Sequence, residues 1–153
     1  DTETHQALVL AHDRTGDPRG AMAALRTAVR VSPMDLALYT ALAGRLADLG
    51  LGEEAERAWT SVVEVKPNEA EGHRLLAQHR EEQERYPDAV TQWQQVVRVR
   101  TDEPDGWLSL AQAQIKATRR DEARRTLRLV LSKTWHERFG DVGKRASELL
   151  RGL

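Results

Sequence analysis

The sequence contains no cysteine, which excludes disulfide bonds and cysteine-ligated metal sites among its 153 residues. Long apolar runs are also missing, and no stretch approaches the roughly 20 apolar residues that a membrane-spanning helix needs. Arginine far outnumbers lysine, which favours a bacterial source. We therefore expect a soluble domain without a membrane segment, while its localisation stays open between the bacterial cytoplasm and periplasm.

Several catalytic motifs are absent as well. The sequence has no His-Glu-x-x-His pattern for zinc, no glycine-rich loop for phosphate and no nucleophile elbow. Its carboxylates are numerous but scattered, and no pair of them stands out for acid–base catalysis. We therefore expect a protein that is not an enzyme and that holds no cofactor.

What the sequence does contain is a repeat of 34 residues, visible in four series of equivalent positions. The series are Ala21, Ala55, Ala89 and Ala123; Leu8, Leu42, Leu76 and Leu110; Leu25, Trp59, Trp93 and Leu127; and Ala28, Val62, Val96 and Val130. A period of this length indicates a stack of helical hairpins, in which each repeat buries its apolar face against its neighbours.

Within one repeat, the residue types fit two closely packed helices. The first helix of the second repeat has an apolar face at i, i+3, i+4 and i+7, made by Tyr39, Leu42, Ala43 and Leu46. The second helix has Ala55, Trp59 and Val62 on one face. Small side chains at Ala43 and Ala55 allow the two backbones to approach, and Pro67 ends the second helix because it cannot continue the hydrogen-bond ladder.

These positions resemble the signature of the tetratricopeptide repeat family, which has aromatic, leucine and small residues in the first helix, alanines flanking an aromatic residue in the second, and a late proline. The resemblance covers residues 2–137, nearly the whole chain. It implies an all-α, right-handed α-solenoid of four helix-turn-helix repeats. It also implies that the first helices line a concave groove, which receives a peptide or a protein segment.

The register divides the chain into four repeats, at residues 2–35, 36–69, 70–103 and 104–137. Residues 138–153 are expected to form one further helix, whose apolar stripe includes Val142 and Ala146. Such a helix would cap the exposed end of the stack. We expect a single domain over residues 1–153 that is a piece of a larger protein, because Asp1 lies almost at the first helix with no leader or initiator methionine before it.

The histidines and tryptophans are expected to pack rather than to bind ligands. His5 and His73 stand at the repeat position of Tyr39 and Trp107, and His12 stands at that of a core leucine. His5 and His12 are seven residues apart, but two histidines need a further ligand to hold zinc. We therefore expect no metal site.

Charge is distributed unevenly along the chain. Residues 1–76 carry 8 basic and 12 acidic groups, a balance of −4, whereas residues 77–153 carry 15 and 12, a balance of +3. The basic end is dominated by Arg119, Arg120, Arg124, Arg125 and Arg128. This cluster is either an anion or nucleic-acid patch or a solvated helix face paired with nearby carboxylates. No stacking aromatics and no glycine-rich RNA motif accompany it, so we favour the second reading.

The family resemblance assigns groove contacts to equivalent positions of each first helix. Our candidate binding residues at these positions are Gln6, Leu10, Thr40, Arg74, Gln78, Leu108, Gln112 and Ile115. Arg74 is the one cation in the middle of the groove, and Gln78 and Gln112 offer amide groups suited to a peptide backbone. The leucines and the isoleucine offer apolar pockets, although the terminal helix is an alternative cover for some of them.

The identity of the partner does not follow from the sequence. One subgroup of the family grips C-terminal carboxylates with lysine, arginine and asparagine, but Gln6, Leu10 and Ala41 stand at three of those positions here. We therefore expect no chaperone-binding role. We predict a protein-interaction module, and the alternative is a structural spacer or a self-association element that forms homo-oligomers within a larger bacterial protein.

Overall fold

The computed structural model describes residues 2–153, with the backbone alone for Thr2, His5 and Gln6. Within this range every regular element is helical, which confirms the all-α fold class. The α-helices are α1 (Thr2–Arg14), α2 (Pro18–Val31), α3 (Leu36–Asp48), α4 (Gly52–Val65), α5 (Ala70–Glu82), α6 (Tyr86–Val99), α7 (Pro104–Lys116), α8 (Arg120–Ser132) and α9 (Val142–Arg151). A short 3₁₀ helix, η1 (Glu137–Phe139), precedes α9.

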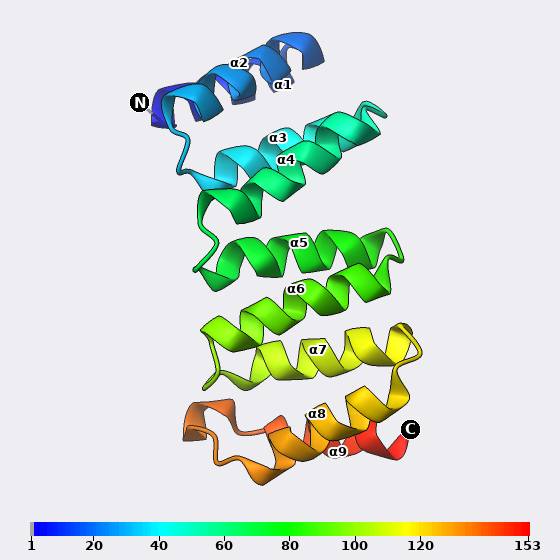
Figure 1. Ribbon diagram of the computed structural model, residues 1–153. Helices are drawn as coiled ribbons and strands as arrows, with labels where there is room; N and C mark the ends of the chain where they lie inside the picture. The colour runs from blue at the N-terminus through cyan, green and yellow to red at the C-terminus, as the bar shows by residue number, and fades with distance from the viewer. Residues whose placement is uncertain (1) are drawn as a thin grey trace. The chain divides into compact units, whose positions relative to one another are not determined.

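The helices recur with the period of the sequence. The odd-numbered helices α1 to α7 begin at residues 2, 36, 70 and 104, and the even-numbered helices α2 to α8 begin at 18, 52, 86 and 120. Each odd-numbered helix folds back onto the even-numbered helix that follows it, so that the two form a hairpin (Figure 1). A helical-repeat fold is therefore observed.

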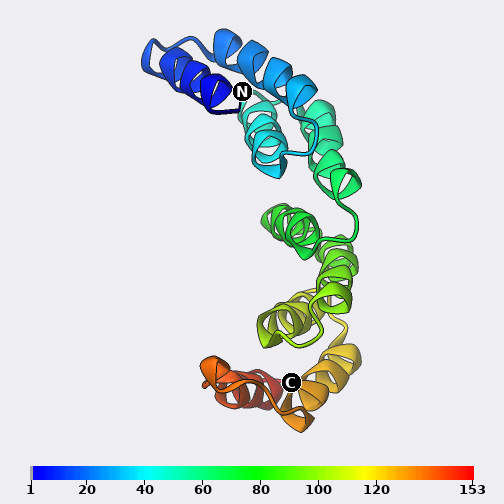
Figure 2. The same cartoon turned by 90° about the vertical axis from the view of Figure 1, so that its left-hand side faces the viewer.

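The chain divides into two compact units, which we describe separately. The N-terminal unit (Asp1–Pro67) contains α1 to α4, and the C-terminal unit (Asn68–Leu153) contains α5 to α9. Inside each unit the first helices of the hairpins lie on one side and the second helices lie on the other, as Figure 2 shows. In the C-terminal unit this arrangement places α5 and α7 on one side, with α9 beside α7.

Aspartates at two helix starts explain where α2 and α3 begin. The side chain of Asp17 accepts a hydrogen bond from the backbone N–H of Gly20 at 2.9 Å, and Pro18 occupies the first helical position. Asp35 accepts from the N–H groups of Ala37 and Leu38 at 2.9 and 3.3 Å. These side chains satisfy N–H groups that the first turn of a helix leaves without an intrahelical partner.

The turn inside each hairpin depends on one residue in the left-handed backbone region. This residue is Gly16 (φ 67°), Gly50 (φ 73°), Glu84 (φ 56°) and Thr118 (φ 60°) in the successive hairpins. Glycine adopts this conformation without steric penalty, whereas a side chain, above all a β-branched one, is strained there. The third and fourth hairpins therefore have the same turn geometry as the first two, but with backbone strain that glycine avoids.

Alanine and medium-sized aliphatic residues make the cores. In the N-terminal unit the buried cluster contains Val9, Ala21, Ala24, Leu25, Ala28 and Leu38. In the C-terminal unit one cluster joins α5, α6 and α7 around Trp93, Val96 and Leu110, and a second joins α7, α8 and α9 around Leu108, Leu127 and Val142. Fully buried alanines such as Ala21 and Ala89 allow the paired helices to approach closely.

The end of the chain differs from the expected single helix over residues 138–153. The α-helix begins at Val142, after the 3₁₀ turn and Gly140. Before that turn the chain is anchored by Trp135, whose Nε1 donates to the carbonyl oxygen of Val130 at 2.8 Å. Val142 and Ala146 are buried in the cluster with α7 and α8, so α9 covers apolar surface of the last hairpin.

Candidate functional site

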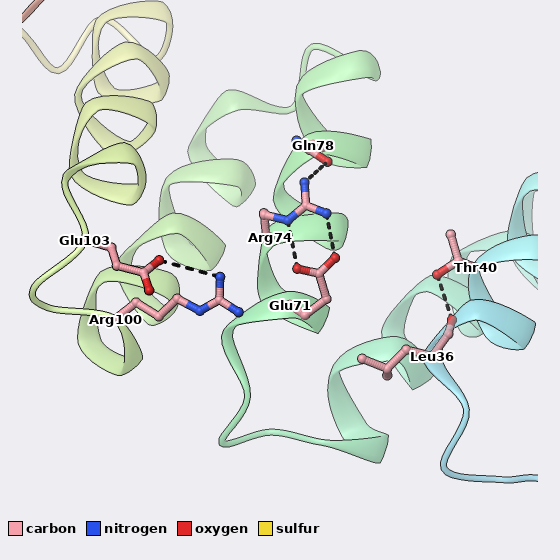
Figure 3. A network of polar contacts seen from close by, with 7 residues as sticks. All are labelled: Leu36, Thr40, Glu71, Arg74, Gln78, Arg100 and Glu103. Atoms are coloured by element: carbon pink, nitrogen blue, oxygen red, sulfur yellow. Dashed lines mark hydrogen bonds and ion pairs between the residues drawn. The ribbon is translucent and has the colours of Figure 1, made fainter. Parts of the chain in front are cut away.

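One connected group of polar side chains lies on α5 (Figure 3), a helix on the side of the C-terminal unit that the first helices form (Figure 2). The Nε and Nη2 atoms of Arg74 donate to the two carboxylate oxygens of Glu71 at 3.0 and 2.5 Å. The Nη1 atom of Arg74 donates to Oε1 of Gln78 at 3.1 Å. The spacing of these residues, three and four positions apart, places them on one helix face.

The pair of Glu71 and Arg74 is electrostatically matched. Hydrogen bonds from Arg74 lower the pKa of Glu71, and the positive charges of Arg74 and Arg100 act in the same direction. The carboxylate of Glu71 in turn raises the pKa of Arg74. Arg74 is therefore not the free cation that its place in the sequence suggests, since its charge is neutralised by a neighbour on its own helix.

On α7, three candidate residues have different surroundings. Leu108 is only 1% exposed and packs with Val142 and Ala146 of α9, so it is not available to a ligand. An apolar pocket is therefore not present at that position, and the alternative, cover by the terminal helix, is the observed arrangement. Gln112 is exposed and Ile115 is half-buried.

In the N-terminal unit, Leu10 on α1 is 59% exposed. Thr40 on α3 is half-buried, and its hydroxyl donates to the carbonyl oxygen of Leu36 at 2.8 Å (Figure 3). This hydrogen bond lies within one helix and uses the proton of the hydroxyl. The hydroxyl oxygen of Thr40 can therefore only accept a hydrogen bond from a ligand. The side chain of Gln6 lies outside the described part of the structure.

The described histidines make local contacts. His73 is buried, with Nδ1 2.8 Å from Oε1 of Gln92 on α6, and His12 lies 3.0 Å from the carboxylate of Asp17. His136 accepts a hydrogen bond from the N–H of Arg138 at the start of η1. In residues 2–153, as far as their side chains are described, no group of three or more histidines and carboxylates is placed to hold a metal.

The arginines of the last hairpin pair partly with their neighbours. Arg124 lies 2.8 Å from Asp121, and Arg119 lies 3.7 Å from Glu122. Arg124 also donates to the carbonyl oxygen of Leu153 at 2.6 Å, which ties the end of the chain to α8. These contacts agree with a solvated helix face. No helix within the described range is both long and apolar enough to cross a membrane.

A groove that the sequence reasoning missed lies in the N-terminal unit, between α2 and the turn that joins α3 to α4. It has a volume of about 610 Å³ and is lined by side chains that include Met22, Arg26, Leu49 and Leu51. The repeat register could have indicated this groove, since other repeats carry polar residues at the position of Leu51. We call this hollow the α2 groove.

Comparison with protein-family models matches the tetratricopeptide repeat to residues 7–62, 40–105 and 74–137. Together these overlapping segments span most of the chain and include residues of all four hairpins. The chain belongs to the tetratricopeptide repeat family. Repeats of this family generally mediate protein–protein interaction or scaffolding, which the helical stack serves by presenting extended surfaces.

Solved structures with the same tetratricopeptide arrangement include several of MamA. The crystal structure of MamA protein is 17% identical, with 98% of this chain and 92% of that chain covered and a TM-score of 0.61. The MamA RS-1 ArsTM double mutant is 15% identical, with 99% and 95% covered and a TM-score of 0.61. At these identities the likeness shows the fold alone. No curated protein matches the sequence.

Proposed function

We propose that this tetratricopeptide domain is a non-enzymatic module that binds an extended peptide or protein segment on the α5–α7 face of its C-terminal unit. The observation that carries the proposal is a pair of exposed glutamines, Gln78 on α5 and Gln112 on α7, two helices that lie on the same side of the unit (Figure 2). They hold equivalent repeat positions 34 residues apart. A primary amide both donates and accepts, so two of them suit the backbone of an extended segment.

The contacts of Arg74 support a neutral rather than an anionic ligand group at this face. Arg74 holds Oε1 of Gln78, which leaves the amide N–H groups of that glutamine free to donate to a ligand. Because the charge of Arg74 is matched by Glu71, the arginine orients the glutamine and contributes little net attraction for a carboxylate. The expected ligand contact is therefore a backbone carbonyl group that accepts from Gln78.

The test is a pull-down with three baits, the wild-type domain and two double variants, read out by quantitative mass spectrometry. The double variant Arg74→Glu, Gln78→Ala should keep its helicity and lose the prey that the wild-type domain retains. The C-terminal unit offers a matched control on α6, because Arg98 donates to Gln95 at 2.9 Å in a similar exposed pair. The variant Arg98→Glu, Gln95→Ala should retain the prey. Equal retention by both variants would show that the α5–α7 face is not the binding surface.

Self-association is the second candidate function, and exposed leucines on α1 favour it. Leu8 is 47% exposed and Leu10 is 59% exposed, so the N-terminal unit presents apolar surface that an identical chain can cover. Light scattering over a concentration series should then show a mass that rises with concentration, and Leu10→Arg should abolish the rise. A constant monomer mass would remove this candidate.

A further inference from the structure

The α2 groove runs along one face of a helix. Residues Arg19, Met22, Arg26 and Arg30 of α2 recur at three- or four-residue intervals along its wall. From Pro18 to Arg30 this wall is about 18 Å long, at 1.5 Å per residue. Leu49 and Leu51 of the α3–α4 turn face it from the opposite wall. The hollow is thus lined by apolar side chains from two elements, with arginines along the α2 wall.

The two leucines of this turn are departures from the repeat. The equivalent positions carry Gln83 and Arg85 in the next hairpin turn, and Ala117 and Arg119 in the one after. Leu49 and Leu51 are 49% and 41% exposed. Leu51 stands at the N-cap of α4 and its side chain accepts no capping hydrogen bond. Leucine is among the poorer residues at an N-cap, so neither burial nor capping explains its presence there.

Arg19 is a second, independent departure from the repeat. Arg19 lies in the first turn of α2, where the helix dipole disfavours positive charge, whereas the equivalent positions in α4 and α8 carry Glu53 and Asp121. Arg26 is paired with Glu54 at 2.6 Å. No described carboxylate pairs with Arg19 or Arg30, and no acidic residue lines the groove. Two unmatched positive charges therefore flank an apolar wall, in the half of the chain whose balance is −4.

We propose that the α2 groove is a second docking site, which binds an acidic amphipathic segment of a partner protein. Aliphatic side chains of the segment pack on Met22, Leu49 and Leu51, and carboxylates on either side of them pair with Arg19 and Arg30. The positive charges of the groove favour an acidic segment. The hollow shape favours a single peptide segment that fits into it over a partner with a flat surface. An anionic membrane is disfavoured because it presents a flat surface, which does not fill the hollow. The site is independent of the α5–α7 face.

The first test uses a fluorescent synthetic helix with leucines at i, i+3, i+4 and i+7 and glutamates on both flanks. Fluorescence anisotropy should show saturable binding to the wild-type domain. The double variant Arg19→Glu, Arg30→Glu should weaken binding by about tenfold or more. Arg125→Glu, Arg128→Glu on α8 is the matched control, since both arginines are exposed and the change in net charge is the same. It should leave the affinity within about twofold of the wild type.

A further variant separates binding from stability. Leu51→Asp places a capping residue at the start of α4 and a negative charge in the groove. It should therefore abolish probe binding while the midpoint of thermal unfolding stays constant or rises. A variant that merely unfolded the domain would lower this midpoint.

The two methionines of the chain provide a direct read-out of the site. Met22 lines the α2 groove and Met34 does not. With ¹³C-methyl-methionine labelling, the probe should shift the Met22 signal and leave the Met34 signal in place. The proposal is overturned if the wild type does not bind the probe, if both double variants weaken binding equally, or if anionic vesicles rather than the peptide shift Met22.

Discussion

Two glycines at the start of α4 should respond in opposite directions to the same substitution. Gly50 has φ of 73°, and Gly52, two residues later, begins the helix without a positive φ. A Cβ atom added at either position meets no heavy atom within 4 Å. Alanine at these two sites therefore tests backbone conformation alone, because no packing contact is gained or lost.

The expected magnitudes follow from the backbone. A residue with a side chain in the left-handed region costs about 1–2 kcal/mol, and the lower entropy of the unfolded chain offsets about 0.4–1 kcal/mol of this cost. Gly50→Ala should therefore lower the free energy of unfolding by about 1 kcal/mol. Gly52→Ala meets no such cost and should raise the free energy of unfolding by about 0.4–1 kcal/mol.

The assay is urea unfolding followed by helical circular dichroism, with a common slope for the wild type and both variants. The reverse change at the last hairpin turn adds a check, since Thr118→Gly removes a strained β-branched residue and should stabilise the protein. Equal effects of Gly50→Ala and Gly52→Ala, or a more stable Gly50→Ala variant, would refute the assignment of a left-handed turn residue at position 50.

Three further outcomes are expected. Leu108→Ala should cost about 2–5 kcal/mol in urea unfolding because it opens a cavity beside α9, whereas Leu10→Ala, at an exposed leucine, should change stability by less than about 0.5 kcal/mol. The pKa of Glu71 is lowered, so the stabilisation from its pair with Arg74 is present above the ordinary glutamate pKa of about 4.3 and is lost as the pH falls through the lower folded value. Both side chains are more than a third exposed, so the stability difference between wild type and Glu71→Gln should be below about 1 kcal/mol at neutral pH and should vanish in acid, as pH-dependent unfolding will show. Ala146→Glu buries a charge against α7 and α8. In calorimetry, the last hairpin of this variant should therefore unfold at a lower temperature than that of the wild type.

The helices were predictable because their signals are local. Asp17 and Asp35 cap the helices that follow them, and small residues recur where two helices approach. The start of the last helix was predicted too early, at residue 138. An apolar stripe reports which residues share a face, but it does not show that residues 137–141 form a 3₁₀ turn before α9 begins.

The candidate site was less predictable than the helices. The partner of Arg74 could have been found, because Glu71 stands three residues before it and this spacing brings side chains together on a helix. The sequence left Leu108 open between an apolar pocket and a cover by the terminal helix, because its burial depends on a helix more than 30 residues away in the chain. Equivalent repeat positions share a backbone environment, but Leu108 also meets α9, whereas Gln112 on the same helix stays exposed.

The sequence by itself therefore determined the helical hairpins, their period and the faces that pack, since helix formation and capping depend on residues within a few positions. Only the tertiary structure decided which of the candidate binding side chains are exposed to solvent. Leu10 and Leu108 are both leucines on first helices, yet one faces solvent and the other is buried under α9. The α2 groove likewise exists only because the α3–α4 turn, about 20 residues or more beyond the wall formed by α2, folds back beside it.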